Sequence, residues 1–331
     1  MPLINRCGGG GGTPQLCGQV ENFKVVPGTV ALTAVLSWTA PSPDEDNSFV
    51  GARIVRKIGS APTGINDGSI VYEGTALTYT DTGLTAGTTY YYRAFAYNAK
   101  KKYQTEYRVI NITAVGIQPN FADNTWDIII NACHSGNVPD TWVAGDSKTM
   151  TIDGADYLVD IVGKNHDTYT AGGIAPLTFG LHDCYGTTYP MNSSNTNLTS
   201  WYNSKMRTET LTAILAKMPE NIQNGIRSVN KLTATSGSSS TIKTASDKLF
   251  TFSEMEVYGS ATLSYSGEGK QYDYYKAGNS KVKKVGSTAS WWWLRSPNRS
   301  HSFNFCTVNT SGSVSVSNSD AKAGVCFGFC F

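Results

Sequence analysis

Short runs of apolar and β-branched residues, separated by turn residues, dominate the amino-terminal third of the chain. The runs lie at 31–38, 51–57, 79–81 and 89–98. Gly, Pro, Asn and Asp fall between them at the spacing that is typical of an antiparallel sandwich. We therefore predict a β-sandwich domain over residues 20–118.

The hydrophobic pattern changes after residues 119–120, which we interpret as a linker. Residues 155–162 alternate and predict a half-buried strand, whereas 210–218 repeats apolar residues with a helical period and ends at Pro219. The buried stripe of this helix comprises Leu211, Ile214, Leu215 and Met218. Mixed strands and helices predict an α+β domain over residues 119–331.

Further segments complete the prediction for this second domain. We expect a short helix at 200–207 with Trp201 packed inward, a loop at 236–241 and a strand at 248–252. At the other end of the chain, Gly8 to Gly12 cannot pack a core. Residues 1–19 are interpreted as an attachment segment that packs against another protein, with a disordered tail as the alternative.

Composition and charge limit the classes of function. The 331 residues carry a net charge of +2, and 16% of them are charged, so nothing favours nucleic-acid binding. The one basic run, at 100–102, fits a solvated turn. The first residues lack the apolar core of a secretory signal, and no window is apolar for the length of a bilayer. We expect synthesis in the cytoplasm and no membrane insertion.

Reactive side chains form no recognisable catalytic or metal motif. The 7 cysteines lack Cys-x-x-Cys spacing, the 4 histidines are scattered, and the carboxylate pairs Asp153/Asp156 and Glu254/Glu256 fit solvated positions. Buried free thiols are expected for Cys133, Cys184, Cys306, Cys326 and Cys330. We predict no catalytic residue, no metal and no cofactor.

The first domain resembles a fibronectin type III domain. Leu36-Ser37-Trp38, followed by Pro41, is similar to that family's second strand with its core Trp, and residues 84–90 are similar to its tyrosine corner. The resemblance implies a spacer or a protein-contact module, and we favour the spacer because no Arg-Gly-Asp loop or exposed aromatic cluster is evident.

The second domain resembles the C-type-lectin-like fold. Its order of strand, helices, long loops and terminal β-meander fits, and residues 291–297 (Trp-Trp-Trp-Leu-Arg-Ser-Pro) are similar to the Trp-Trp-Leu-Arg-Ser-Pro strand of a phage and gut-bacterial family of that fold. The segments 221–231, 247–250 and 268–275 are also similar to that family. The resemblance covers about residues 121–331.

The end of the chain, 298–331, is similar to target proteins of diversity-generating retroelements. Randomising the first two adenines of an Asn codon cannot give Lys, Glu, Gln, Met or Trp, and residues 298–320 contain none of these. The resemblance implies a variable ligand-binding face on a packed aromatic base. That base would be Trp291, Trp293, Phe303, Phe305, Phe327 and Phe329. Along this stretch Phe303 and Phe305 predict that Thr307 and Asn309 face inward, whereas Val308 predicts the reverse, so we expect a bend or bulge near Cys306. The face, chosen by residue type, would be Asn298, Arg299, Ser300, His301, Ser302, Asn304, Thr307, Asn309, Thr310, Ser311, Ser313, Ser315, Ser317, Asn318, Ser319 and Asp320.

Two other activities of this fold are disfavoured. Calcium-dependent sugar binding uses Glu-Pro-Asn or Gln-Pro-Asp, but here Ser296 precedes Pro297-Asn298. A formylglycine-generating oxidase needs a reactive cysteine pair, whereas Cys326 and Cys330 lie among Phe residues.

These features predict a non-enzymatic receptor-binding protein of a phage tail tip or fibre. Its partners would be a host-cell surface protein or glycan and, through the amino-terminal segment, other tail proteins. We expect a homo-oligomer, with a trimer as the simplest guess, located in the virion. The alternatives are a bacterial surface-displayed diversified adhesin and a structural tail protein.

Overall fold

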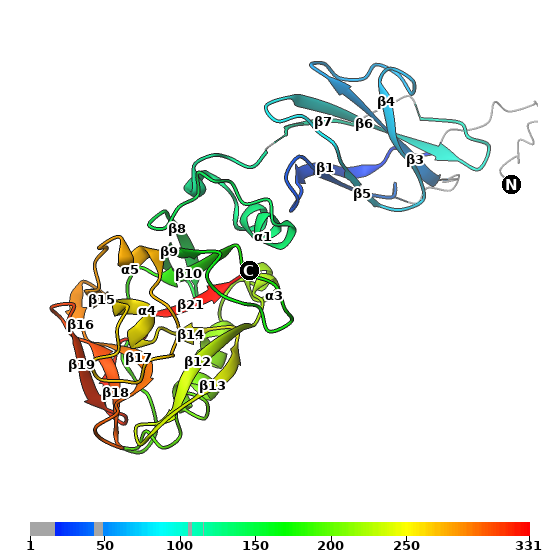
Figure 1. The fold of residues 1–331 in the computed structure, drawn as a ribbon. Helices are drawn as coiled ribbons and strands as arrows, with labels where there is room; N and C mark the ends of the chain where they lie inside the picture. Colours follow the sequence, from blue (N-terminus) through cyan, green and yellow to red (C-terminus); the bar gives the residue numbers. More distant parts are fainter. Residues whose placement is uncertain (1–16, 43–48, 105–107, 115) are drawn as a thin grey trace, which may run out of the picture. The chain divides into compact units, whose positions relative to one another are not determined.

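The computed structural model describes residues 17–42, 49–104, 108–114 and 116–331. The chain divides into two compact units, Met1–Ile117 and Gln118–Phe331 (Figure 1). The division falls beside the predicted linker. Residues 1–16 of the predicted attachment segment lie outside the described residues, but Cys17 is buried in the core of the first unit.

The first unit is a β-sandwich, as the alternating pattern predicts. One sheet has the order β1-β2-β5 and the other β4-β3-β6-β7, all antiparallel. The strands are β1 (Glu21–Pro27), β2 (Ala34–Thr39), β3 (Phe49–Ile58), β4 (Ser69–Gly74), β5 (Thr78–Asp81), β6 (Thr89–Asn98) and β7 (Arg108–Thr113).

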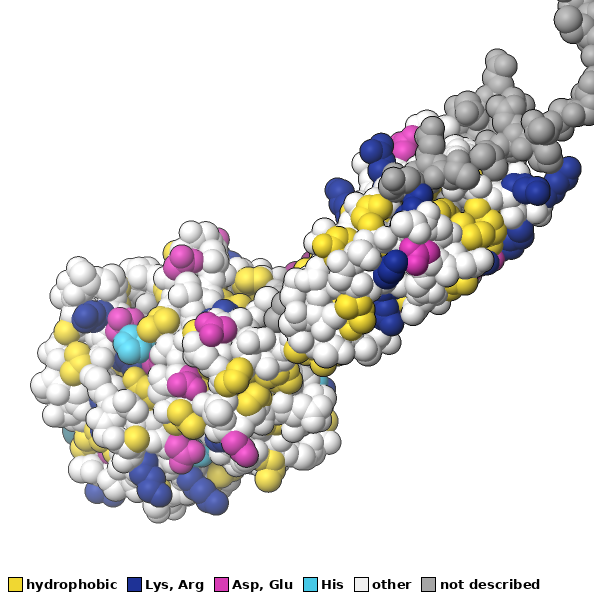
Figure 2. All heavy atoms as spheres, turned by 90° about the horizontal axis from the view of Figure 1, so that it is seen from above, with side chains coloured by type: hydrophobic (Ala, Val, Ile, Leu, Met, Phe, Trp, Pro, Cys, Tyr) yellow, Lys and Arg dark blue, Asp and Glu magenta, His cyan; other side chains and the backbone are white. Residues whose placement is uncertain are grey.

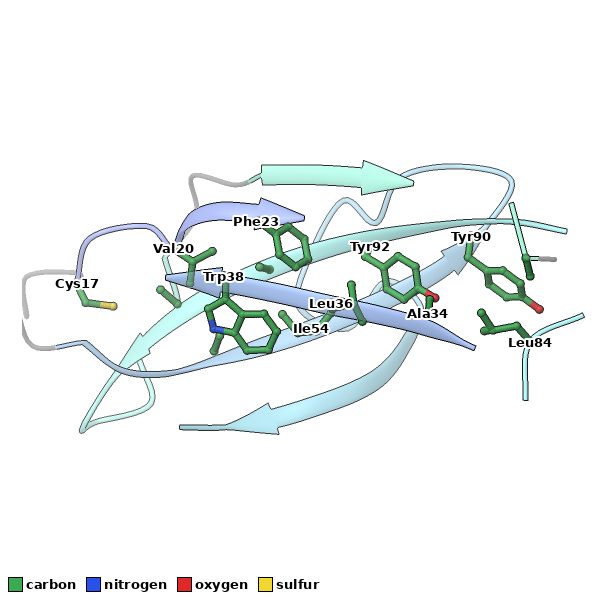
Figure 3. Packing of buried hydrophobic residues seen from close by; sticks show 14 residues of the cluster. Cys17, Val20, Phe23, Ala34, Leu36, Trp38, Ile54, Leu84, Tyr90 and Tyr92 are labelled. Carbon is green, nitrogen blue, oxygen red and sulfur yellow. The ribbon is translucent and has the colours of Figure 1, made fainter. Parts of the chain in front are cut away.

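The core of the sandwich contains the residues on which its resemblance rests. Leu36 and Trp38 alternate inward along β2 and pack between the sheets (Figure 3). Tyr90 is also buried, and its hydroxyl accepts a hydrogen bond from the backbone nitrogen of Thr85 at 3.0 Å. This is the hydrogen bond of a tyrosine corner, so the predicted fibronectin type III-like sandwich is confirmed.

The second unit mixes strands with short helices. Its helices are η1 (Phe121–Asp123), α1 (Trp126–Ser135), the π-helix η2 (Met206–Thr210), α2 (Leu211–Leu215), α3 (Glu220–Gly225), α4 (Glu254–Tyr258) and α5 (Asp273–Lys276). Its strands are β8 (Ser147–Ile152), β9 (Ala155–Lys164), β10 (Leu177–Leu181), β11 (Tyr189–Pro190), β12 (Val229–Ser236), β13 (Ser239–Asp247), β14 (Phe250–Thr251), β15 (Lys283–Val285), β16 (Thr288–Ser290), β17 (Trp292–Pro297), β18 (Asn304–Val308), β19 (Val314–Asn318), β20 (Lys322–Ala323) and β21 (Phe327–Cys330).

A five-stranded sheet with the order β14-β21-β10-β9-β8 forms the core of this unit. Every residue of β10 and β21 is buried, because the two strands are central and both faces of the sheet are covered. The rings of Phe179 and Phe329 stack at 5.4 Å between centroids, and Phe121 lies against Phe179 at 6.1 Å. The last strand of the chain is therefore locked into the centre of the unit.

Several predicted elements are confirmed, and others are corrected. The strand at 155–162 lies within β9. Of the predicted stripe in front of Pro219, Leu211, Ile214 and Met218 are buried, whereas Leu215 is only half-buried. Residues 200–203 form a turn rather than a helix, although Trp201 is fully buried as predicted. The expected loop at 236–241 is instead the tight turn of the β12–β13 hairpin, and the strand at 248–252 shrinks to β14.

Strands β17, β18 and β19 form a separate antiparallel sheet, with β18 in the middle. Trp293 pairs with Thr307 and Pro297 with Phe305, so three residues of β17 face one residue, Cys306, of β18. The predicted irregularity thus lies opposite Cys306, on the neighbouring strand. No helix in the described part of the chain is long and apolar enough to span a membrane.

Candidate ligand-binding surface

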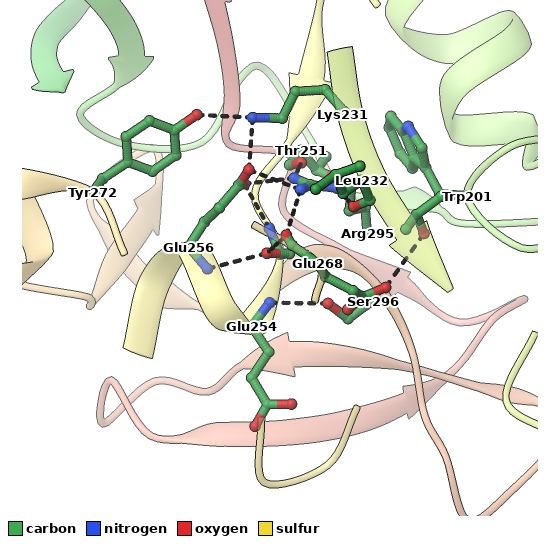
Figure 4. Close-up of polar contacts among 12 residues, drawn as sticks. Trp201, Lys231, Leu232, Thr251, Glu254, Glu256, Glu268, Tyr272, Arg295 and Ser296 are labelled. Carbon is green, nitrogen blue, oxygen red and sulfur yellow. Dashed lines mark hydrogen bonds and ion pairs between the residues drawn. The ribbon is translucent and has the colours of Figure 1, made fainter. Parts of the chain in front are cut away.

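The Trp-rich strand β17 is anchored by its arginine. The guanidinium of Arg295 is fully buried and bonds both carboxylate oxygens of Glu256, at 2.5 and 2.7 Å (Figure 4). Its remaining donors reach the backbone oxygens of Leu232, Thr251 and Glu268. All five N–H groups of the side chain are used internally, so Arg295 is a structural residue rather than a ligand contact.

A second buried cation completes this network. The ammonium of Lys231 lies 2.6 Å from Glu256 and 2.7 Å from Asp167, and it also donates to the hydroxyl of Tyr272. Burial raises the pKa of Glu256, but Arg295 and Lys231 outweigh it and hold that pKa below its usual range. The carboxylate therefore stays charged between the two cations.

Glu254, at the start of α4, connects this network to the loop after β17. Its carboxylate accepts hydrogen bonds from the backbone nitrogens of residues 262–264 at 2.7 to 3.1 Å. The oxygen of Leu263 then accepts from the backbone of Arg299 and from the side chain of Asn298. The expectation that Glu254 and Glu256 are solvated carboxylates is wrong, because both are buried and bonded.

Asn197 holds the same loop from the other side. The two N–H groups of its side-chain nitrogen are shared among the backbone oxygens of Asn298, His301 and Asn304, which lie 3.2, 2.7 and 2.8 Å away. Its side-chain oxygen accepts from the backbone of Gly237 in the β12–β13 turn. One buried amide thus fixes the path of residues 298–304 through their backbone. No sequence motif pointed to Asn197.

The turn between β18 and β19 is organised by its own first residue. The side-chain oxygen of Asn309 accepts from the backbone nitrogens of Ser311 and Ser313, both at 3.0 Å. Gly312 adopts a positive φ of 82°, and its oxygen accepts a hydrogen bond from the hydroxyl of Tyr258. The turn is therefore held in part by the side chain of Asn309, which belongs to the predicted face, and in part by Tyr258, which lies outside the predicted variable segment.

Most of the predicted face is exposed or half-exposed, and its members form two groups. The loop group surrounds the bond from the backbone nitrogen of Ser319 to the oxygen of Phe303, and the turn group lies at the other end of the β18–β19 hairpin. The loop group is Arg299, Ser300, His301, Ser302, Asn318 and Asp320. The turn group is Asn309, Thr310, Ser311 and Ser313, joined to the first by Ser315 and Ser317 on the edge strand β19. We call these residues the candidate surface.

The remaining predicted face residues are buried, which corrects their assignment. Asn298, Asn304, Thr307 and Ser319 expose at most 8% of their surface. Asn304 and Thr307 lie on the central strand β18, which is covered on both faces. Asn298 organises the loop, and the Ser319 hydroxyl bonds the oxygen of Ser194. Residue type alone therefore does not distinguish a buried Asn, Ser or Thr from an exposed one.

The aromatic base differs in part from the prediction. Phe305, Phe327, Phe329 and Trp293 are buried as expected, and Trp292 joins them. Trp291 and Phe303, by contrast, are 41% and 40% exposed. The ring of Phe303 lies against the ring of His301 at 5.4 Å, so this Phe extends the candidate surface with an apolar contact.

The described cysteines are all buried and unpaired, including the five predicted to be so. Burial raises the pKa of Cys326 to about 11, and it raises that of Cys330 well above its usual value. A thiol in such surroundings is a poor nucleophile. Within the described residues, no cluster of His, Cys, Asp and Glu has the arrangement of a metal site.

Comparison with known proteins gives limited matches. Residues 181–330 match a family model described as "Domain of unknown function (DUF6273)". No curated protein matches the sequence. Because the family model covers less than half of the chain, it describes only part of the second unit.

Solved structures resemble about a third of the chain. One is the FN1–FN3 domains of chicken CNTN1, with 16% sequence identity and a TM-score of 0.25. The match covers 30% of this chain and 32% of that chain. The chain thus spans about a third of that structure's length. Another is the fibronectin type III domain of human fibronectin type III domain containing protein 3, with 16% sequence identity and a TM-score of 0.27. The match covers 35% of this chain and 100% of that chain.

Proposed function

We propose that the chain is a non-enzymatic receptor-binding protein of a phage tail, which recognises a host-cell surface protein or glycan through the candidate surface. In this proposal the second unit is C-type-lectin-like and the fibronectin type III-like unit is a spacer. The amino-terminal segment would join other tail proteins, and the virion would be its place of action.

The observation that carries the proposal is that, in the loop group, the exposed side chains are separate from the bonds that hold their backbone. Asn197 bonds backbone atoms of the loop, and Glu254 supports it through the backbone of Leu263. The turn, by comparison, depends on Tyr258 and on the side chain of Asn309. Arg299, Ser300 and Ser302 project from this loop without supporting it. Such a surface can change its side chains while its fold persists, which is what a diversified binding face requires.

The chemistry of the candidate surface suits recognition. Serine and asparagine have few rotamers, so ordering them on binding costs little entropy, and His301, Phe303 and Arg299 add an apolar and a cationic contact. A small polar face of this kind binds weakly by itself. Several copies on one tail would raise the overall affinity, so a homo-oligomer, and a trimer as the simplest form, belongs to the proposal.

The diversification hypothesis now concerns a smaller set of positions. Every residue of the loop group can arise from an Asn codon by changes at its first two adenines. Sequencing the gene from many phages of one population should show substitutions concentrated in the candidate surface. Substitutions scattered evenly over 298–331, buried positions included, would contradict the hypothesis.

Binding to cells tests the proposed function directly. We would label the full chain with a fluorophore and incubate it with a panel of cultured gut bacteria. A triple variant, Arg299→Ala with His301→Ala and Asn318→Ala, should reduce the bound protein about fivefold or more on strains that the parent binds. Its melting temperature should stay within about 2 °C, since exposed changes cost little stability.

A matched control uses exposed residues on β13, with Thr241→Ala and Lys243→Ala, and should bind as the parent does. The proposal fails if no strain binds the parent, or if the triple variant binds every strain as well as the parent.

A further inference from the structure

The second unit contains two clefts that share a wall. The larger has a volume of about 510 Å³ and lies between the turn at 169–172, the residues 226–228 that precede β12, and the end of β13. The smaller, about 270 Å³, lies between α2 and residues 246–249. Ser246 and Lys248 line both clefts, so the two are adjacent, and we refer to them together as the groove.

This groove is remote from the candidate surface along the β12–β13 hairpin. It lies where Val229 pairs with Asp247, at the open end of the hairpin. Asn197 and the loop at 298–304 contact Gly237 in the turn at the other end (Figure 1). A ligand in the groove would therefore use residues that the proposed function leaves unassigned.

The charge of the groove is positive. Arg227 and Lys248 are exposed, and neither forms an ion pair with any residue that the structure describes. The guanidinium of Arg227 lies over the ring of Tyr169, 5.5 Å from its centroid. No Asp or Glu lines the larger cleft. Figure 2 shows acidic and basic side chains scattered over the molecular surface.

The smaller cleft adds a third cation with a fixed position. Arg207 bonds the buried carboxylate of Asp247 at 2.5 Å, and the indole of Trp201 bonds the same carboxylate at 2.8 Å. Arg207 also donates to the backbone oxygens of Tyr202 and Ser246. Asp247 bonds these two partners, whereas Arg227 and Lys248 have no carboxylate partner among the described residues; Lys248 donates only to the backbone oxygen of Gln223, at 3.4 Å.

The rest of the lining favours a saccharide over a bare ion. The hydroxyls of Thr170 and Ser246, which line the larger cleft, bond each other at 2.8 Å, and Ser228 lines the same cleft. Ala171 and Ile226 supply apolar wall in the larger cleft. Hydroxyl partners next to apolar carbon match a sugar ring, and a guanidinium matches a carboxylate in two-point contact.

We propose that the groove formed by Arg227, Lys248 and Ser246 binds a carboxylated oligosaccharide, separately from the candidate surface. Arg227 would pair with the carboxylate of one residue, Lys248 with that of the next, and the hydroxyl side chains would bond the sugar hydroxyls. The chain would then have a second contact for acidic polysaccharide on a cell surface.

Calorimetric titration of the full chain with hexagalacturonate tests the proposal. The oligosaccharide should bind, and its affinity should fall as sodium chloride screens the charges. The double variant Arg227→Gln with Lys248→Gln should weaken binding about tenfold or more, because two charge-assisted contacts are lost. Lys243→Gln, an exposed lysine of β13 outside the groove, should leave the affinity unchanged, and neutral maltohexaose should not bind.

Other outcomes overturn the proposal. Absence of hexagalacturonate binding by the parent does so, as does equal binding by the double variant. Inorganic phosphate that binds through Arg227 and Lys248 while hexagalacturonate does not would assign the groove to a phosphate ligand instead. The Arg299, His301 and Asn318 triple variant should bind hexagalacturonate normally, so failure here and failure of the proposed function are distinguishable.

Discussion

At the scale of single residues, the arginine of the Trp-rich strand shows why a motif does not by itself identify a contact residue. Arg295 lies next to the proposed binding segment in sequence, but all of its donors point into the unit. Its partner Glu256 also holds Lys231. Removing one member of such a buried group leaves a charge without compensation, which costs more than the pair itself contributes.

We therefore expect Glu256→Gln to destabilise the second unit by about 3–5 kcal/mol. Both Arg295 and Lys231 lose their shared carboxylate in this variant, whereas the shape of the side chain is kept. Urea unfolding followed by tryptophan fluorescence measures the change. Glu209→Gln is the matched control, since Glu209 pairs with Lys205 on the exposed surface at 3.8 Å and should change stability by less than about 0.5 kcal/mol.

Asparagine illustrates the limit of assignment by residue type. Asn298 and Asn318 have the same side chain and both lie in the segment predicted to vary, yet one is buried and the other exposed. Asn298 is buried because its amide closes the turn that follows β17 and bonds the oxygen of Leu263. Such a bond depends on a partner distant in sequence, and no local pattern reveals it.

At the scale of elements, the regular parts of the fold were predictable from the sequence, whereas the irregular parts were not. The strands of the sandwich, β9 and the buried stripe of α2 follow from the period of apolar residues. The period of apolar residues does not show which side chains of β18 face outward, because both of its faces are covered and every residue is buried. Period 2 separates faces only when one of them meets water.

The loop at 298–304 is the element on which the candidate surface depends, and Asn197 is its main support. We expect Asn197→Ala to destabilise the second unit by about 1–3 kcal/mol, because three backbone oxygens and the amide of Gly237 lose a buried partner. Hydrogen exchange should become faster at the amides of Asn298 and Gly237.

Asn318→Ala provides the comparison for this variant. Asn318 is exposed, so its replacement should change stability by less than about 0.5 kcal/mol and leave the exchange rates of the loop unchanged. Similar effects from the two replacements would show that the loop is held by something other than Asn197.

At the scale of the whole molecule, the chain consists of two units with separate cores. The core of the first unit has Trp38 and Tyr92 between its sheets, and that of the second has Phe179 and Phe329 on its central strands. Both the candidate surface and the proposed saccharide groove belong to the second unit. A spacer role for the first unit then predicts that its stability can change without affecting binding.

Tyr90→Phe in the full chain tests this separation. The variant removes the acceptor for the backbone nitrogen of Thr85, which should destabilise the first unit by about 1–3 kcal/mol. Calorimetry should show a lower melting temperature for one transition and an unchanged second one, and binding to bacteria should equal that of the parent. Tyr91→Phe loses a hydroxyl for which no hydrogen bond is found in the described residues, so it should shift neither transition. If Tyr90→Phe shifted both transitions, or if binding fell with the stability of the sandwich, the first unit would take part in recognition rather than only carry the second.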